Sequence, residues 1–163
     1  MQARMGNPAV VIPEAMQALM ALGGVPAKTG LSPLLLELVN LRASQINGCS
    51  ACVDIHSREL KAAGEPDPRI VMVAAWRETP YFTDAERAAL ALTDAVTRLA
   101  DRPDPVPDEV WDEAARHYDD AQLSALVLAI AAINAWNRLN VATRQITSDA
   151  VEQLISRKPA VAL

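Results

Sequence analysis

Aromatic residues are scarce in this chain, at 4% of its 163 positions, although hydrophobic residues make up 51%. A core made from these residues must consist mostly of Ala, Leu and Val side chains, which suits closely packed helices. The mean hydropathy of +0.09 is high for a chain of this length. An apolar surplus on a small domain indicates contacts between subunits, because a lone subunit has too much surface to hide it. We therefore expect a homo-oligomer.

Basic clusters, an export signal and long apolar runs are also missing. The net charge is −5, and no basic cluster of the kind that binds phosphate backbones is present, so nucleic acid is not an expected partner. The first residues lack the apolar core of a signal peptide. The most apolar stretch, residues 123–136, is too short to span a bilayer, and we interpret it as a buried helix. These absences predict a cytoplasmic protein with no membrane partner.

The pattern of prolines and glycines predicts a string of helices in a single domain over residues 1–163. No segment shows the sustained alternation of a strand. Ser32-Pro33 begins one helix, Asn47-Gly48 ends it, and a second helix runs from near Cys49 to Gly64. The fold class expected is all-α, a helical bundle with its site on this helical hairpin. The other expected helices cover about 8–24, 66–76, 84–100, 107–118 and 119–145, with a short one from Ser148.

The chain has only two cysteines, Cys49 and Cys52, and they are three residues apart. This spacing cannot join distant segments, and in a reducing cytoplasm a Cys-x-x-Cys pair is more often redox-active or metal-binding than structural. Together with His56 they share one face of a helix. Cys49 is expected in the first turn, where free N–H groups and the helix dipole favour thiolate. His56, one turn beyond Cys52, is placed to take its proton.

Glu37 is the acidic residue that the hairpin brings toward this face. If the two helices fold back around Asn47-Gly48, Glu37 lies across from Arg58, with His56 half a turn away. A carboxylate that orients an imidazole, which in turn activates a thiol, is an established arrangement of nucleophile, base and orienting group. The alternative for Glu37 is a structural pairing with Arg42. Three polar residues, Asn134, Asn137 and Arg138, interrupt the apolar helix and need hydrogen-bond partners.

These residues resemble the core motif of the alkylhydroperoxidase D-like branch of the carboxymuconolactone decarboxylase superfamily. The resemblance rests on Glu37, Arg42, Asn47-Gly48, the stretch from Cys49 to Cys52, and His56. Residues 132–144 are similar to the last core helix of these proteins, so the likeness covers about 31–144. Some family members carry a histidine where this chain has Ala51.

The resemblance implies an all-helical subunit that forms trimers or hexamers and reduces hydroperoxides without a metal or other cofactor. It implies that Cys52 attacks the peroxide, that Cys49 resolves the sulfenic acid to a disulfide, and that His56 and Glu37 relay protons. The partners it implies are a hydroperoxide substrate and a dithiol reductant protein, either lipoyl or thioredoxin-like.

Three alternatives stay open at this point. A zinc site could use Cys49, Cys52, His56 and Glu37, although the only other histidine, His117, lies on a different predicted helix. The pair could act as a redox sensor, in which a disulfide changes a subunit interface and does not turn over. The thiols could also be buried as small hydrophobic side chains.

Overall fold

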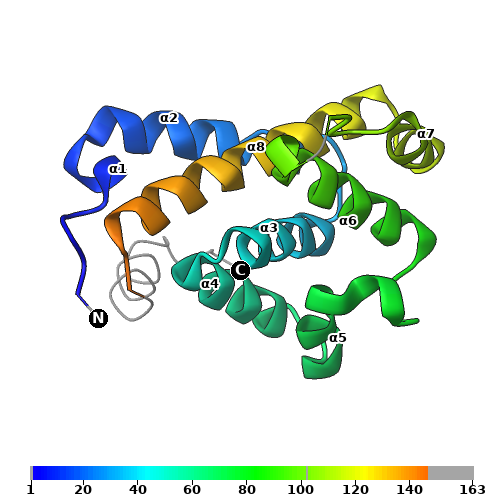
Figure 1. The fold of residues 1–163 in the computed structure, drawn as a ribbon, viewed down its shortest axis with the longest axis horizontal. Helices are drawn as coiled ribbons and strands as arrows, with labels where there is room; N and C mark the ends of the chain where they lie inside the picture. The colour runs from blue at the N-terminus through cyan, green and yellow to red at the C-terminus, as the bar shows by residue number, and fades with distance from the viewer. Residues whose placement is uncertain (1, 102, 147–163) are drawn as a thin grey trace.

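The computed structural model describes residues 2–101 and 103–146. Every regular element among these residues is a helix, which confirms the all-α prediction. The short helix expected from Ser148 lies outside the described residues. The α-helices are α1 (Pro8–Val11), α2 (Pro13–Gly24), α3 (Pro33–Asn47), α4 (Ser50–Ala62), α5 (Asp67–Met72), α6 (Asp84–Thr97), α7 (Asp108–His117) and α8 (Asp120–Thr143), and the 3-10 turns are η1 (Pro26–Lys28), η2 (Val73–Glu78) and η3 (Leu99–Asp101) (Figure 1).

Helix α3 lies in the middle of the molecule and packs against α4, α6 and α8 (Figure 1). Its apolar side chains point to more than one neighbour. Leu35 and Val39 belong to a core cluster shared with α6, α7 and α8, whereas Leu38 and Leu41 belong to a second cluster shared with α4 and η2. Helix α3 therefore connects the two clusters.

Helix α8 runs past the expected apolar stretch at both ends. It begins at a capping box, in which Asp119 accepts a hydrogen bond from the backbone of Gln122 and Gln122 reaches back to Asp119. It is the one described helix whose length and composition would suffice to cross a membrane. Leu126, Ile130 and Ile133 are nevertheless buried, and the helix packs against α2, α3 and α6. The expectation of a buried core helix is therefore confirmed.

Three predicted helices differ from the observed ones in local detail. The first is interrupted at Ile12, because Pro13 has no N–H and holds the preceding residue in an extended conformation (φ −114°, ψ 96°). The helix expected over 66–76 is α5 followed by η2, with a non-helical residue at Ala75. The helix expected to end near Ala100 ends at Thr97 and continues as η3.

A buried ion-pair network joins α3, α6 and η2. The guanidinium of Arg42 donates to Asp94 Oδ1 at 2.5 Å and to Oδ2 at 3.2 Å, and Arg77 donates to the same carboxylate. Burial opposes ionisation of Asp94, but the hydrogen bonds from Arg42 and then Arg77 outweigh it and hold the pKa of this carboxyl below its ordinary value. The alternative pairing of Glu37 with Arg42 is wrong, since the register of α3 turns Arg42 toward α6.

Candidate active site

The turn between α3 and α4 decides where the first cysteine lies. Gly48 has a left-handed backbone (φ +66°) and its N–H donates to Gln45 O, while the N–H of Cys49 donates to Ser44 O at 3.0 Å. This is a Schellman ending, which favours glycine at the left-handed position. Cys49 therefore precedes α4 as its N-cap and is not in the first turn as expected. Its own N–H is used to close α3.

The two thiols lie side by side in an apolar surrounding. Cys49 Sγ and Cys52 Sγ are 2.6 Å apart, and the residues are only 2% and 3% exposed. Both cysteines are free. Ala43 and Ile133 belong to the same buried cluster, and the partly buried Trp136 packs against it. Because the two sulfurs are in contact, oxidation can join them in a disulfide bond.

The contact between the thiols separates their pKa values. The hydrogen bond from Cys52 is the largest influence on Cys49 and lowers its pKa to about 6, against the opposing effect of burial. The same hydrogen bond, followed by burial and by the charge on Cys49, raises the pKa of Cys52. The acidity of Cys49 has the direction expected from the start of a helix, but its main cause is the neighbouring thiol. Such a pair titrates as a unit, with one thiolate formed far more readily than the second.

The structure brings Glu37 and His56 together across the hairpin. Glu37 Oε2 lies 2.7 Å from His56 Nδ1, and the two side chains are 29% and 15% exposed. Arg58, which was expected opposite Glu37, turns to solvent and bonds to Asp54 one turn earlier. With Nδ1–H donated to the carboxylate, Nε2 is the nitrogen left to exchange protons.

No hydrogen bond joins His56 to either sulfur within the described part of the chain. The direct contact expected from the spacing of Cys52 and His56 is therefore not formed in this structure, and Cys52 bonds to another group. The side-chain amide of Asn140 on α8 donates to Cys52 Sγ at 3.2 Å. Glu37, His56, Cys49 and Cys52 are thus placed in one region, but the helix that completes the site is α8.

Amide side chains of α8 form a network beside the thiols. Asn137 is fully buried, donates to Ser44 Oγ at 3.1 Å and accepts from Asn47 Nδ2 at 2.9 Å. Asn134 also accepts from Asn47, and Arg138 donates back to Asn134. The expectation that these residues need hydrogen-bond partners is confirmed. The role of Asn140 was missed, although its spacing of three from Asn137 places both amides on the same side of α8.

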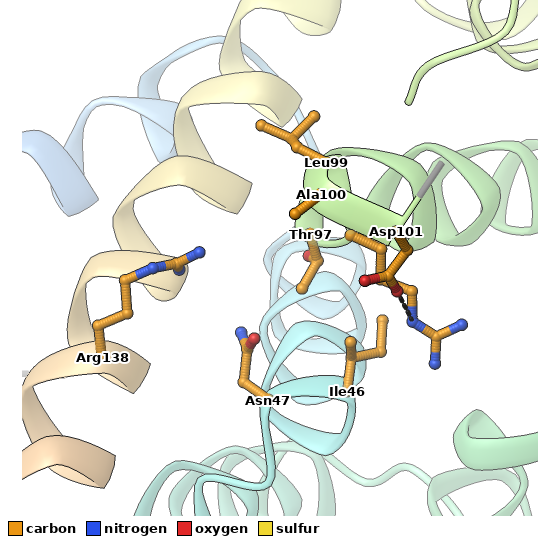
Figure 2. A pocket seen from close by; sticks show the side chains of 8 residues that line it. Ile46, Asn47, Thr97, Leu99, Ala100, Asp101 and Arg138 are labelled. Carbon is orange, nitrogen blue, oxygen red and sulfur yellow. Dashed lines mark ion pairs between the residues drawn. The ribbon is translucent and has the colours of Figure 1, made fainter. Parts of the chain in front are cut away.

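A cleft of about 450 Å³ lies at the far end of this amide network (Figure 2). Asn47 from α3 and Arg138 from α8 point toward it from two sides, and the Arg98–Asp101 ion pair lies at its edge. The residues that line it are Ile46, Asn47, Thr97, Arg98, Leu99, Ala100, Asp101 and Arg138. None of the four predicted site residues lines the cleft. Asn47, which does line it, donates a hydrogen bond to Asn137 in the amide network beside the thiols.

Within residues 2–101 and 103–146, no three His, Cys, Asp or Glu side chains lie together in a way that could hold a metal ion. His117, the other histidine, bonds to Glu113 on α7. The carboxylate of Glu37 is occupied by His56.

The fold and the site define an all-helical protein with a dithiol centre on a helical hairpin. The sequence profile of the carboxymuconolactone decarboxylase family matches residues 13–95, which include all four predicted site residues. The protein YdfG of Bacillus subtilis (strain 168) is 35% identical over 132 residues, or 81% of this chain and 88% of its own length. YnjA of Escherichia coli (strain K12) is 32% identical over 115 residues, or 71% of this chain and 62% of its own length.

Solved structures agree with this assignment. A crystal structure of an Agrobacterium tumefaciens protein of unknown function, for which a role in antioxidant defence as AhpD has been suggested, has a TM-score of 0.83 at 39% identity and covers 89% of this chain and 97% of its own. The debrominase Bmp8 shows the same fold at 21% identity, with a TM-score of 0.74 over 88% of this chain and 76% of its own. The chain belongs to the carboxymuconolactone decarboxylase family, in its alkylhydroperoxidase D-like branch.

Proposed function

We propose that this protein is a thiol peroxidase, which reduces hydroperoxides by oxidising the Cys49–Cys52 pair to a disulfide. The observation that supports it best is the pair itself, with sulfurs 2.6 Å apart and the pKa of Cys49 lowered to about 6. A thiolate is the form of cysteine that attacks a peroxide, and a second sulfur in contact with the attacking one resolves the product.

The proposed reaction has three steps. His56 takes the proton that Cys52 holds in the resting pair, and the Cys52 thiolate attacks the terminal oxygen of the hydroperoxide. The O–O bond breaks, and the departing alkoxide takes that proton from His56 to become an alcohol. The Cys49 thiolate then attacks the sulfur of the Cys52 sulfenic acid, the S–O bond breaks, and the departing hydroxide takes a proton from solvent and leaves as water as the disulfide forms. A dithiol protein, lipoyl or thioredoxin-like, reduces this disulfide and is oxidised to its own disulfide.

Glu37 and His56 supply the proton relay in this scheme. Glu37 holds Nδ1 of His56, so Nε2 is free to accept the thiol proton and later to deliver it to the alkoxide. His56 has no direct bond to a sulfur in the described residues, and a water molecule or the arrival of substrate would complete the path. Hydrogen bonds of this kind are often long before substrate binds.

A redox sensor is the second candidate, and the burial of both cysteines favours it. At 2% and 3% exposure, the sulfurs are open to a small peroxide more easily than to a bulky protein reductant. A sensor would be oxidised once and would then stay oxidised. A peroxidase needs a partner that reaches the disulfide, and we propose the cytoplasm as the compartment because dithiol reductants are kept reduced there.

Peroxide consumption, measured with several dithiol reductants in turn, separates the two candidates. We expect many equivalents of peroxide to be consumed per subunit with at least one reductant, and we expect Cys49→Ser and Cys52→Ser each to stop turnover. Ser50→Ala, which changes an exposed neighbour between the two cysteines, is the matched control and should retain turnover. Consumption of one equivalent followed by arrest with every reductant would contradict a peroxidase and support a sensor.

A further inference from the structure

The hydrogen bond to Cys52 comes from a side chain whose direction is fixed by its surroundings. The backbone N–H of Ala9 can only donate, so the group that faces it at 2.8 Å must be the oxygen of Asn7. The nitrogen of the Asn7 amide then faces Asn140 Oδ1, at 2.6 Å. Asn140 must therefore present its own nitrogen to Cys52 Sγ, at 3.2 Å. The ambiguity between oxygen and nitrogen in an amide is resolved here by a chain of bonds that begins at a backbone donor.

We propose that Asn140 is a catalytic residue of the thiol site, which donates to Cys52 Sγ and stabilises its thiolate and sulfenate, and that Asn7 is a positioning residue which fixes the direction of that donor. The inference deepens the proposed function, because the thiolate is the nucleophile of that reaction.

Burial makes this donor effective. Asn140 is 8% exposed and Cys52 is 3% exposed, so solvent contributes little to the stabilisation of a charge on this sulfur. A hydrogen bond to an ionised group in such a place is stronger than one between neutral groups. The amides of Asn140 and Asn137 lower the pKa of both thiols, as expected of hydrogen-bond donors to a thiolate. On Cys52 this lowering is smaller than the rise caused by Cys49 and by burial.

Glu37, His56 and Arg138 each have a partner other than the thiols. On α3 and α4, Glu37 and His56 bond to each other, and on α8 Arg138 bonds to Asn134. The N-terminal segment adds Arg4, whose guanidinium is taken by the carbonyl of Ala142. The hydrogen bond that Cys52 Sγ accepts from outside the pair comes from the neutral amide of Asn140, and the neutral amide of Asn137 acts on both thiols in the same direction.

Asn7 is well placed for its role because the N-terminal segment runs along the end of α8. The backbone N–H of Arg4 donates to Thr143 O at 2.9 Å, and Gln145 Nε2 donates to Met5 O at 3.0 Å. These bonds hold the segment against the last turns of α8, where Asn140 lies. A contact between residues 133 positions apart in the chain is thus kept in register.

The test measures the acidity of one thiol without any peroxide. In the Cys49→Ser background Cys52 is the only thiol left, and the rate of its alkylation by iodoacetamide against pH gives its pKa. Asn140→Leu should raise that pKa by roughly one unit, a tenfold change in the acid dissociation constant. Since no peroxide is used, a shifted profile in a protein without peroxidase activity would leave this inference standing while the proposed function failed.

Asn7→Asp tests the direction of the amide with the helix cap retained. The new side chain still accepts from Ala9, but it turns a second oxygen toward Asn140, which should rotate and present its oxygen to Cys52. We expect the pKa of Cys52 to rise here as well, and to stay raised at high salt, because screening weakens a distant charge and leaves the rotation unchanged. Asn7→Ser keeps the cap and removes the amide, so its effect should be smaller.

The inference is overturned if Asn140→Leu and Asn7→Asp, each folded by circular dichroism, leave the alkylation profile of Cys52 unchanged. It is also overturned if the Asn7→Asp shift disappears at high salt, which would make it an effect of charge. If Asn140→Leu does not fold, the Asn7 variants decide the question alone.

Discussion

The two sulfurs differ in what surrounds them, and the difference bears on which one attacks. Cys49 owes its lowered pKa to Cys52, and Cys52 owes most of its raised pKa to Cys49. When Cys49 is replaced, that opposing influence disappears, while the donor Asn140 stays against Cys52 and His56 stays one turn away. The dipole term at a helix start is only about 0.3–1 kcal/mol.

We therefore predict that Cys49→Ser consumes one equivalent of peroxide and traps a sulfenic acid on Cys52. Cys52→Ser should react far more slowly, and Glu37→Gln should slow the first step without abolishing disulfide formation. Dimedone labelling followed by peptide mass spectrometry locates the sulfenic acid. A label on Cys49 of the Cys52→Ser protein, formed at the wild-type rate, would reverse the order of attack.

The two thiols and the neighbouring histidine could be found from the sequence, but the donor on α8 could not. Cys49, Cys52 and His56 are separated by three and four residues, so helical geometry alone places them together. Glu37 is brought toward them when the two helices fold back on each other at the turn around Asn47-Gly48. Asn140 is 88 residues from Cys52, and their contact depends on how α8 packs against the hairpin, which local patterns do not determine.

At the scale of the elements, the hairpin turn is held by a glycine. Gly48 has φ +66°, and no heavy atom lies within 4 Å of the position that a Cβ would take, so only its conformation opposes a side chain. Gly48→Ala should lower the free energy of unfolding by about 1–2 kcal/mol. Gly23→Ala is the matched control, because it lies in α2 with equal space and an ordinary helical backbone, and it should raise the free energy by about 0.5–1 kcal/mol. Urea unfolding measures both changes in the free energy of unfolding. If the two substitutions change it in the same direction, the left-handed conformation of Gly48 does not explain the effect.

The ion-pair network tests how α3, α6 and η2 are held together. Asp94→Asn leaves the buried Arg42 without its counter-charge and should cost about 3–5 kcal/mol of stability, whereas Asp101→Asn on the exposed η3 should change it by less than about 0.5 kcal/mol. Because the pKa of Asp94 is lowered in the folded state, its contribution is complete above the ordinary pKa of about 3.9 and is lost as the pH falls further. Urea unfolding should give a difference between wild type and Asp94→Asn that shrinks in acid.

Most helices could be located from the sequence because their limits are set by nearby residues. The capping box at Thr83 and Glu86 and the Schellman glycine at position 48 act within a few positions. One error is the break at Ile12 before Pro13, and the other two occur where a helix continues as a tighter turn, as at Thr97. Whether an α-helix or a 3-10 turn forms there depends on packing, and the residue types at this point suit both.

At the scale of the whole molecule, α1 and α2 leave apolar side chains without cover. Val10, Val11, Ile12 and Met20 are 41–58% exposed, and none of the residues of α2 is buried. In Figure 1 both helices lie on one side of α8, at the edge of the molecule. We propose that this face lies between subunits of a homo-oligomer, a trimer or hexamer.

Light scattering should therefore give a mass that is a multiple of the 17.5 kDa subunit. Introducing a charge with Val11→Asp or Met20→Asp should lower that mass, because an unpaired charge is costly in an apolar interface. Val71→Asp, at an apolar position on α5 that is 68% exposed, should leave the mass unchanged. A wild-type mass equal to one subunit would refute the assembly.

The separated pKa values of Cys49 and Cys52 make the oxidation state of the pair a charge state as well. Above about pH 6 the reduced pair carries one negative charge and one proton, so forming the disulfide releases two electrons but only one proton. The midpoint potential should then become more negative by about 30 mV per pH unit, and by about 59 mV per unit below pH 6, where two protons leave. A redox titration across this range should show the change of slope at the pKa of Cys49, and a constant slope would mean that the two thiols lose their protons together.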